Sequence, residues 1–442
     1  MFGVCTKRLF CSVSRRMTNR LRGIHPRLVP RAPDPRPSLA ILPALRDVGD
    51  DFAWAVWYAV WRVRGEDDAE GSGPGEGLDR FGDALGRVPQ LDDALRSLAD
   101  YLRGIGSRRD AADALLRISE WALERGDPEP AIQCAEAAAA LMPESGRRSL
   151  AAGRANRLFS EAARATLYYE RAMTLGRLRR KWRTYVRAHL GLGHITKDRG
   201  ETAAARAHYF TAARAARSLS GEKWLAAQTQ HDLMALAAEN GEVERALRHA
   251  RQALDWYPRH HARFPALAHD IGFLLVRLHL YEPAVPLLTI VMHLPVPPQD
   301  QVIGWSTVAR AAAGTGNAAA YHAASENVLR LVGLFDLHAA GAFDNLAHGA
   351  CSLALWKQAE QYAARSIEIA RRTKETHCEA NATQALDSAR AQRVPDQGTA
   401  VDARVADPLL ELAKDISQAL AAWRGVTWKR KRQSGPERLG KV

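Results

Sequence analysis

The sequence predicts an all-α protein built from a tandem array of helical hairpins, and three observations carry that prediction. Helix-compatible segments follow one another from residue 78 to residue 394, broken by Gly, Asn or Pro at intervals of 10 to 20 residues. The alternating patterns typical of strands are nearly absent from this stretch. A fixed pattern of small and aromatic residues returns seven times along it, which indicates a repeat architecture.

The repeated pattern is centred on one alanine. A small residue lies twelve positions before it, and further small or aromatic residues follow it at +4 and +7. The central position falls at Ala131, Ala165, Ala205, Ala246, Ala284, Tyr321 and Ala359, so that Tyr321 departs from the pattern in the sixth copy. Successive copies are 34 to 41 residues apart. Small residues at these positions allow two helices to approach closely, and each hairpin leaves an apolar face that only its neighbour can cover.

This pattern resembles the tetratricopeptide repeat, a helical hairpin of about 34 residues. Its wider spacing is similar to that of the repeat arrays of bacterial signalling regulators. The resemblance covers most of the chain, and it implies a right-handed α-solenoid of about seven hairpins over residues 78–394.

The segments before the array differ from it in composition. Residues 1–50 are basic and rich in proline, so we expect them to be largely disordered. Residues 51–64 predict a helix with Trp54, Trp57, Tyr58 and Trp61 on one face. We expect this helix to dock on a neighbouring apolar surface, with a membrane interface as the alternative. Residues 65–77 (GEDDAEGSGPGEG) predict a flexible linker.

Both ends of the chain carry tails of strong positive charge. The first 33 residues contain no acid and have a net charge of +8, which suits either an organelle transit peptide or sequence upstream of a true start at Met17; we favour the second. After the array, residues 395–407 predict a linker and residues 408–425 an amphipathic helix that docks back on it. Residues 426–442 form a second basic tail. The chain between the tails is close to neutral, so its net charge of +13 is not a property of the array.

The composition indicates in which cellular compartment and in which kind of organism the protein is found. Five cysteines at irregular spacing form no disulfide framework, which favours a reducing compartment. No apolar run reaches the roughly 18 residues that a membrane span requires. The bias of Arg over Lys and the abundance of Ala suggest GC-rich codons. We therefore expect a cytoplasmic bacterial protein.

The sequence contains no enzyme motif on which a reaction could be based. Ser220 and Lys223 have the spacing of an acyl-transfer pair, but they fall in a turn between repeats. His348 and Cys351 share a helical face and His377-Cys378 lies on a later helix, although packing explains them more simply than a metal does. We expect no catalytic residues, no metal and no cofactor.

In proteins that this sequence resembles, peptides lie along the concave face formed by the first helix of each hairpin. That face includes positions −6, −3, +1 and +4 relative to the small residue in the middle of the helix. The resulting candidate peptide-binding residues are Arg147, Arg154, Arg157, Arg187, His194, Lys197, His231, His269, Phe273 and Arg310. Leu150, Leu190, Val276 and His348 fall on the same stripe. Its cations suit a protein or peptide with acidic or C-terminal carboxylate groups.

Two functions from different classes follow. The first is a non-enzymatic adaptor, scaffold or sensor that binds a protein or peptide on the concave face, although a solvated arginine face needs no ligand. The second is a nucleic-acid-associated regulator whose basic tails, such as Lys429–Arg432 beside Trp428, contact phosphates. Neither tail carries a recognised base-reading motif, which makes this the alternative.

Overall fold

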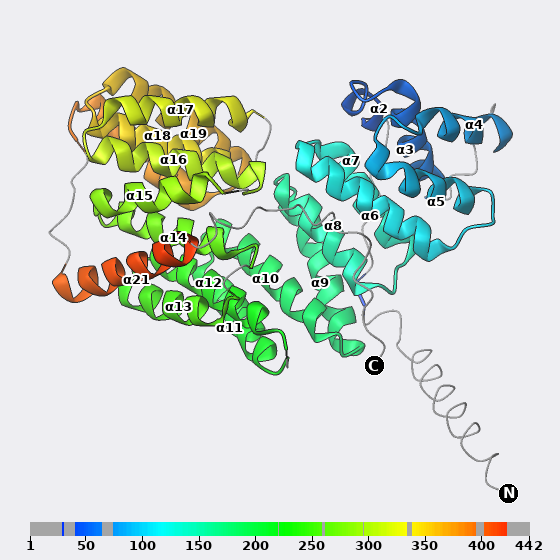
Figure 1. Cartoon of the computed structure of the whole chain (residues 1–442), viewed down its shortest axis with the longest axis horizontal. Helices are drawn as coiled ribbons and strands as arrows, with labels where there is room; N and C mark the ends of the chain where they lie inside the picture. The colour runs from blue at the N-terminus through cyan, green and yellow to red at the C-terminus, as the bar shows by residue number, and fades with distance from the viewer. Residues whose placement is uncertain are drawn as a thin grey trace, which may run out of the picture. The chain divides into compact units, whose positions relative to one another are not determined.

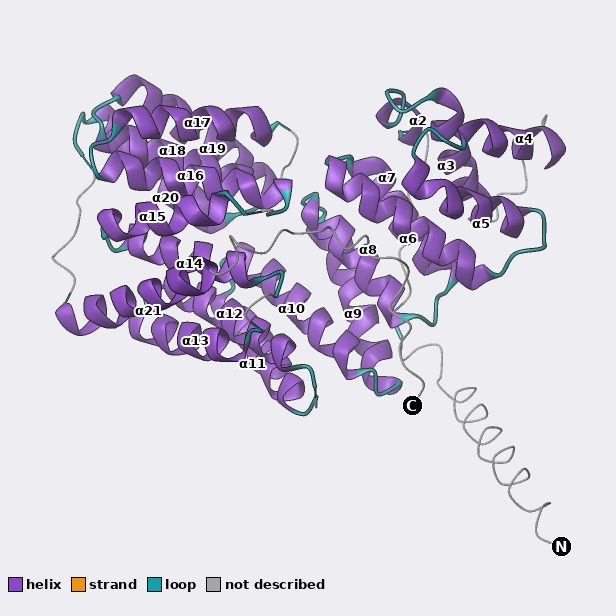
Figure 2. Ribbon diagram, viewed as in Figure 1, coloured by secondary structure: helices purple, strands orange, loops and turns teal. Residues whose placement is uncertain are grey.

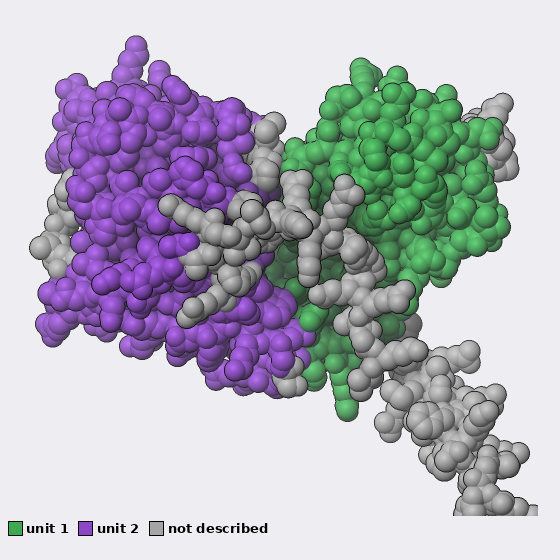
Figure 3. Space-filling model, in the orientation of Figure 1, with its two compact units in different colours: residues 1–195 green, residues 196–442 purple. Residues whose placement is uncertain are grey.

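The computed structural model describes residues 29–30, 40–63, 74–219, 221–258, 261–294, 296–333, 338–394 and 402–421. These residues fall into two compact units, within residues 1–195 and 196–442 (Figure 3). Every regular element of the described residues is a helix (Figure 2), and none of these helices combines the length and apolarity needed to cross a bilayer.

The first unit contains α2 to α9 and the beginning of α10. Its elements are α2 (Ile41–Ala44), α3 (Asp50–Val63), α4 (Pro74–Ala84), the 3-10 helix η2 (Pro89–Leu91), α5 (Asp92–Leu102), α6 (Arg108–Arg125), α7 (Pro128–Leu141), α8 (Gly146–Leu158) and α9 (Ala162–Leu178). Helix α10 (Trp182–Asp198) begins in this unit and ends in the second.

The second unit contains α11 to α21, whose order can be followed in Figure 1. Its helices are α11 (Thr202–Arg217), α12 (Lys223–Glu239), α13 (Val243–Trp256), α14 (Phe264–Arg277), α15 (Tyr281–Met292), α16 (Pro298–Gly314), α17 (Ala318–Val332), α18 (Ala339–Ser352), α19 (Trp356–Thr373), α20 (Thr376–Arg390) and α21 (Ala403–Ala421).

Successive helices pair as antiparallel hairpins. The packed pairs are α6 with α7, α8 with α9, α12 with α13, α14 with α15, α16 with α17, and α18 with α19. We call the first helix of each pair an A helix and the second a B helix; α10 and α11 occupy these places in the third repeat, and α20 follows as a further A helix. The all-α solenoid of tetratricopeptide-like hairpins predicted from the sequence is confirmed.

The same turn joins the two helices of all seven hairpins. Its last residue donates its N–H to the carbonyl five positions earlier over 2.8 to 3.0 Å, as Asp127 does to Ala122 and Leu355 does to Ala350. The residue just before it has a positive φ of 57 to 83°. That left-handed conformation ends a helix and suits glycine, which supplies four of the seven positions, at 126, 200, 241 and 316.

The central residue of the sequence pattern follows each turn by four positions and points into the core. All seven of these residues have no exposed surface, including Tyr321. Twelve residues earlier, Gly153 and Gly272 lie on the A helices, where an added Cβ would approach Tyr169 to 2.9 Å and Leu288 to 2.5 Å. In these two hairpins the small residue and the +4 residue of the pattern are therefore contact partners.

The structure departs from the expected segment boundaries at three places. Ile41–Ala44 is a short helix in the segment expected to be largely disordered, and both Ile41 and Leu45 are fully buried. Helix α4 begins at Pro74, inside the expected linker 65–77. Helix α21 begins at Ala403, because the Asp402 carboxylate accepts the Arg404 N–H over 2.9 Å and so caps the helix before Pro408. The expected basic tail 426–442, the possible start at Met17 and Lys429–Arg432 lie outside the described residues.

The tryptophan-bearing helix α3 packs against α2, α4, α5 and α7. Its buried face is mostly aliphatic and includes Ala55, Val56, Ala59 and Val60. The predicted aromatic stripe lies at the edge of this face, where Tyr58 is buried and the three tryptophans are half-buried. The rings pair along the helix, as in the stack of Trp54 on Tyr58 at a centroid distance of 4.7 Å. The helix is thus docked within its own unit, chiefly through its aliphatic residues.

Helix α21 also docks within its own unit, against α13, α14 and α15. Leu409, Leu412, Ile416 and Leu420 have no exposed surface, so one face of the helix belongs to the core. At the edge, Arg251 of α13 forms an ion pair of 2.8 Å with Glu411. The amphipathic pattern therefore corresponds to a helix that covers the middle repeats of the second unit.

Candidate functional site

Polar side chains connect the A helices of the second unit from α12 to α20. These helices pack directly on one another as α12 with α14, α14 with α16, α16 with α18, and α18 with α20. Stacking places residues about one repeat length apart side by side, so that several of the polar contacts join residues 35 to 39 positions apart. We call this surface the A-helix face.

The face begins with a carboxylate shared by two histidines. Asp270 of α14 is bonded through one oxygen to His231 Nε2 of α12 at 2.8 Å and through the other to His269 Nδ1 at 2.9 Å. Burial raises the pKa of Asp270, but the hydrogen bonds and charges of the two histidines outweigh it and hold this pKa well below its usual range. Asp270 is therefore ionised, and it fixes the orientation of both imidazole rings.

Asp270, His269 and Thr307 follow one another in the order of a catalytic triad. His269 Nε2 lies 3.1 Å from Thr307 Oγ1, and its other ring nitrogen lies 2.9 Å from Asp270. However, Thr307 has no exposed surface, and its hydroxyl donates to the Ile303 carbonyl over 2.8 Å. Because this hydroxyl cannot reach a substrate, the three residues form a structural hydrogen-bond chain.

The polar contacts of the A-helix face continue at an amide side chain on α18. Asn345 is buried; its Oδ1 accepts a hydrogen bond from Arg310 Nη1 at 3.2 Å, and its Nδ2 donates to Ser306 Oγ at 3.2 Å. Both partners lie on α16, so the amide links two consecutive A helices. Burial lowers the pKa of the Arg310 guanidinium, an effect that Asp344 opposes and Arg277 reinforces. Since arginine ordinarily titrates above 12, Arg310 keeps its charge.

The last A helix contributes His377 and Asn381. His377 Nε2 lies 3.4 Å from Arg277 Nη1 of α14 and 3.1 Å from Asn381 Nδ2. Both neighbours are donors, so this ring nitrogen is the acceptor. Burial lowers the pKa of His377, and Arg277 and Lys197 lower it further against the opposing effect of Glu239. His377 is therefore a neutral acceptor at neutral pH.

The histidines and cysteines considered as metal ligands have other partners. His348 Nε2 lies 3.5 Å from the Asp344 carboxylate, and the Cys351 thiol faces the Ala385 carbonyl. Burial raises the pKa of Cys351 to about 11, which disfavours the thiolate that a metal requires. Within the described ranges, no three His, Cys, Asp or Glu side chains converge as a metal site would need.

The ten candidate binding residues divide between the two units. Arg147, Arg154 and Arg187 are exposed on α8 and α10, whereas Arg157 and His194 are half-buried. Lys197 belongs to the second unit and forms an ion pair of 2.7 Å with Glu239. His231 and His269 share Asp270, Phe273 is half-buried, and Arg310 bonds to Asn345.

The stripe expected on α14 is displaced by one residue. Val276 at its +4 position is fully buried, whereas the next residue, Arg277, is half-buried and faces α20. Sequence reasoning also missed Asp270, Asn345 and Asn381. Their signal is a spacing of roughly one repeat between polar residues, as from His231 to Asp270 and from Ser306 to Asn345.

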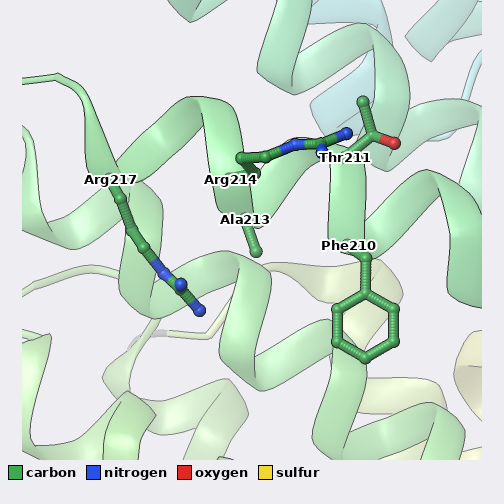
Figure 4. A pocket seen from close by; sticks show the side chains of 5 residues that line it. All are labelled: Phe210, Thr211, Ala213, Arg214 and Arg217. Carbon is green, nitrogen blue, oxygen red and sulfur yellow. The ribbon is translucent and has the colours of Figure 1, made fainter.

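A shallow cavity of about 300 Å³ lies on α11, away from these polar contacts. Figure 4 shows its lining side chains, Phe210, Thr211, Ala213, Arg214 and Arg217. One helix supplies all five, so no second element of the described chain opposes them to orient a ligand. The A-helix face, where several helices converge, is the better candidate site.

Comparisons with known proteins give no family model and no curated protein that matches this chain. Among solved structures, it is similar to the Rap conjugation gene regulator of plasmid pLS20 in complex with the Phr* peptide, at 13% identity over 77% of this chain and 98% of that one, with a TM-score of 0.49. It is similar to the Cut9–Hcn1 hetero-tetramer of the APC/C at 15% identity, over 77% and 63% of the two chains, with a TM-score of 0.44. A Rap protein complexed with competence and sporulation factor gives 13% identity over 84% and 100%, with a TM-score of 0.39.

Proposed function

We propose that the chain binds a protein or peptide along its A helices and acts as a non-enzymatic adaptor, scaffold or sensor in the bacterial cytoplasm. The observation that carries this proposal is the A-helix face, where oriented polar groups from consecutive helices lie side by side. The partly exposed members of this face, His269, Asp270 and Arg310, can offer a partner fixed donors and acceptors at the spacing of the repeats. The triad-like arrangement on this face cannot act through its hydroxyl, because Thr307 is enclosed.

The binding residues in this proposal are the ten predicted from the sequence. In the first unit, Arg147, Arg154, Arg157 and Arg187 supply positive charge for acidic or C-terminal carboxylate groups, together with His194. In the second unit, Phe273 supplies an apolar contact beside the histidines of α12 and α14, and Lys197 and Arg310 supply further positive charge.

A charge-reversal experiment tests the arginines of the first unit. Arg147, Arg154, Arg157 and Arg187 are changed together to Glu, and partners are captured from a native lysate by this variant and by the wild type. The matched control changes Arg96, Arg103, Arg214 and Arg217 to Glu, which alters the net charge equally at exposed positions on α5, just after its end and on α11. Circular dichroism verifies that both variants remain helical.

A partner captured by the wild type and the control, but lost by the first variant, would support the proposal. Equal capture by all three proteins would rule out this arginine stripe as the binding surface. Loss from both variants would indicate a general effect of charge. Capture of nucleic acid that disappears when residues 426–442 are removed would favour the alternative regulator.

A further inference from the structure

The turn between α9 and α10 concentrates positive charge around an exposed tryptophan. The sequence contains no Asp or Glu between Glu170 and Asp198. The turn and the helix ends beside it carry Trp182 and five cations, all of them exposed: Arg177, Arg179, Arg180, Lys181 and Arg183. We call residues 177–183 the basic turn. It lies within the first unit and contains none of the ten candidate binding residues.

Most of these cations are not neutralised by the protein itself. Within the described ranges, no ion pair and no side-chain hydrogen bond is formed by four of them, Arg177, Arg179, Arg180 and Lys181. Other exposed arginines have a carboxylate beside them, as Arg365 has Glu368 at 2.6 Å. The abundance of arginine in this chain therefore does not by itself explain an unpaired cluster.

The helix dipoles favour only part of the cluster. Arg177 lies in the last turn of α9, where a cation suits the negative end of the helix. Lys181 directly precedes α10 and Arg183 lies in its first turn, which contains no acid. This is the positive end of α10, where the dipole disfavours cations. Helix stability therefore does not explain the whole cluster, and a bound anion would relieve the repulsion within it.

The backbone of the turn and the ring of Trp182 are both held in place. The Lys181 N–H donates to the Gly176 carbonyl over 2.8 Å. Gly176 packs so closely on α10 that an added Cβ would lie 2.8 Å from the Tyr185 nitrogen. The Trp182 ring packs at right angles to Tyr185, at a centroid distance of 5.6 Å, and remains 40% exposed. An aromatic surface is therefore positioned among the cations before a ligand arrives.

We propose that the basic turn binds single-stranded nucleic acid, with its cations on the phosphates and Trp182 stacked on a base. The planar guanidinium of arginine matches the oxygens of a phosphate. An exposed aromatic ring serves as a stacking platform for any of the bases. This site is part of the folded first unit, so it is distinct from the basic tails, and it does not depend on peptide binding along the A helices.

Trp182 favours a single strand over the other polyanions that a cluster of cations can bind. The bases of a duplex are paired and stacked on one another, so a duplex offers phosphates but no free base to the ring. A membrane surface requires an apolar face that inserts between the lipids. Trp182, flanked by Lys181 and Arg183, is the single exposed large apolar side chain of residues 177–183, all of which the structure describes.

The first test measures how the cations of the turn contribute to binding by the full chain. Fluorescence anisotropy follows labelled strands of about 12 nucleotides, one of DNA and one of RNA, and a DNA duplex of the same length. The turn variant carries four changes to Gln, at Arg177, Arg179, Arg180 and Lys181. The matched control changes four exposed arginines outside the turn to Gln, namely Arg108, Arg109, Arg390 and Arg393. Both variants lose the same charge, and circular dichroism verifies that both remain helical.

The turn variant is expected to bind single strands at least about 10-fold more weakly than the wild type and the control at about 100 mM salt. The slope of log K against log[salt] is expected to become shallower by about 2–3, the loss of four phosphate contacts. The basic tails are present in all three proteins, so the difference reports the turn alone. Equal affinities of the three proteins would overturn the proposal, as would equal losses in the turn variant and the control.

The second test measures stacking by Trp182. Trp182→Ala is expected to weaken single-strand binding about 5- to 100-fold, but to change the duplex affinity by less than about 2-fold. Trp182→Phe keeps a ring at the same place and is expected to retain most of the affinity, which separates stacking from a folding defect. Phe210→Ala is the control, because Phe210 is an exposed ring beside Arg214 and Arg217 on another helix; its affinity should equal that of the wild type.

Three outcomes identify the ligand. Loss of affinity in the turn variant without any loss in Trp182→Ala would overturn the proposal in favour of phosphate contacts alone. Sedimentation with vesicles of phosphatidylserine and phosphatidylcholine tests the membrane. Vesicle binding that depends on the turn, without single-strand binding that depends on it, would overturn the proposal in favour of a lipid surface. Tighter binding of the RNA or of the DNA strand, lost in the turn variant and in Trp182→Ala, would support the proposal and identify which nucleic acid is the ligand.

Discussion

Gly191 of α10 lies against the ring of Tyr169 of α9, so closely that a Cβ at position 191 would come within 2.4 Å of the ring carbon Cζ. Gly153 of α8 approaches the same ring, where a Cβ would lie 2.9 Å from Cδ1. Tyr169 is buried and belongs to the cluster that contains Ala165, Leu192 and Ile195. One tyrosine thus joins its own hairpin to the next, and two glycines provide the space that it occupies.

Substitution of Gly191 by Ala is therefore expected to destabilise the first unit. The added methyl group forces the Tyr169 ring or the α10 backbone to move, which costs about 1–3 kcal/mol. Thermal and urea unfolding measure the change. Gly82→Ala is the matched control, because a Cβ there meets nothing within 4 Å and Ala favours a helix by about 1 kcal/mol over Gly. An unchanged stability in Gly191→Ala would contradict the contact. So would a double variant, Gly191→Ala with Tyr169→Leu, that does not recover the stability lost in Gly191→Ala.

Substitution of Tyr321 by Ala restores the repeat pattern but is expected to destabilise the second unit. The ring is fully buried, its hydroxyl donates to the Leu346 carbonyl over 3.1 Å, and Gly349 leaves room for it. Removing the ring creates a cavity and costs about 3–5 kcal/mol, whereas Tyr321→Phe removes only a hydrogen bond worth about 1 kcal/mol. Urea unfolding of the two variants distinguishes these costs. Equal losses would show that packing of the ring is not what stabilises this repeat.

The shared carboxylate of Asp270 gives the stability a defined pH dependence. Its folded-state pKa lies below the unfolded value of about 3.9, so its contribution is present above that pH and is lost as the pH falls through and below it. Asp270→Asn is expected to cost about 2 kcal/mol at pH 6 through the weakened histidine hydrogen bonds. Urea unfolding between pH 3 and pH 7 measures the gap in the free energy of unfolding between this variant and the wild type. This gap should shrink toward pH 3. The exposed control Asp387→Asn should show no such gap, and a gap for Asp270→Asn that grows on acidification would refute the explanation.

The two kinds of contact that hold α21 should differ strongly in strength. Ile416 has no exposed surface, so Ile416→Ala is expected to cost about 2–5 kcal/mol. Glu411 is exposed, and its ion pair with Arg251 is worth less than about 1 kcal/mol. Limited proteolysis after residue 394, together with thermal unfolding, reports the release of the helix. If Glu411→Ala released α21 as readily as Ile416→Ala, the apolar face would not be what holds it.

The helical hairpins were predictable because their determinants are local. The residues of each turn and the small residue that follows recur at a regular spacing, so a single chain of seven copies reveals the pattern even where Tyr321 departs from it. The ends of α4 and α21 were less predictable. The sequence predicts a linker at Pro74 and a helix start at Pro408, whereas α4 begins at Pro74 and the Asp402 cap begins α21 five residues before Pro408.

The site was predictable only in part, because its contacts lie between helices. His231, His269 and Arg310 were selected from the pattern of single helices, but their partners Asp270 and Asn345 are defined by how consecutive A helices stack. A rotation of α14 by one residue exchanges Val276 for Arg277 on the open face, and a helical periodicity of 3.6 residues does not fix that rotation. The contact of Arg277 with His377 therefore became visible only when the arrangement of α14 and α20 was known.

The docking of α21 has a consequence for the order in which the protein is made. Residues 403–421 are synthesised well after α13, α14 and α15, whose surface they cover. During translation, the apolar surface that later receives Leu409, Leu412 and Ile416 has no cover until residues 403–421 have left the ribosome. A messenger truncated before this helix would therefore yield a product with an exposed apolar surface. Quality-control proteases and chaperones recognise such surfaces. The presence of α21 thus distinguishes chains in which this surface is covered from chains in which it is exposed.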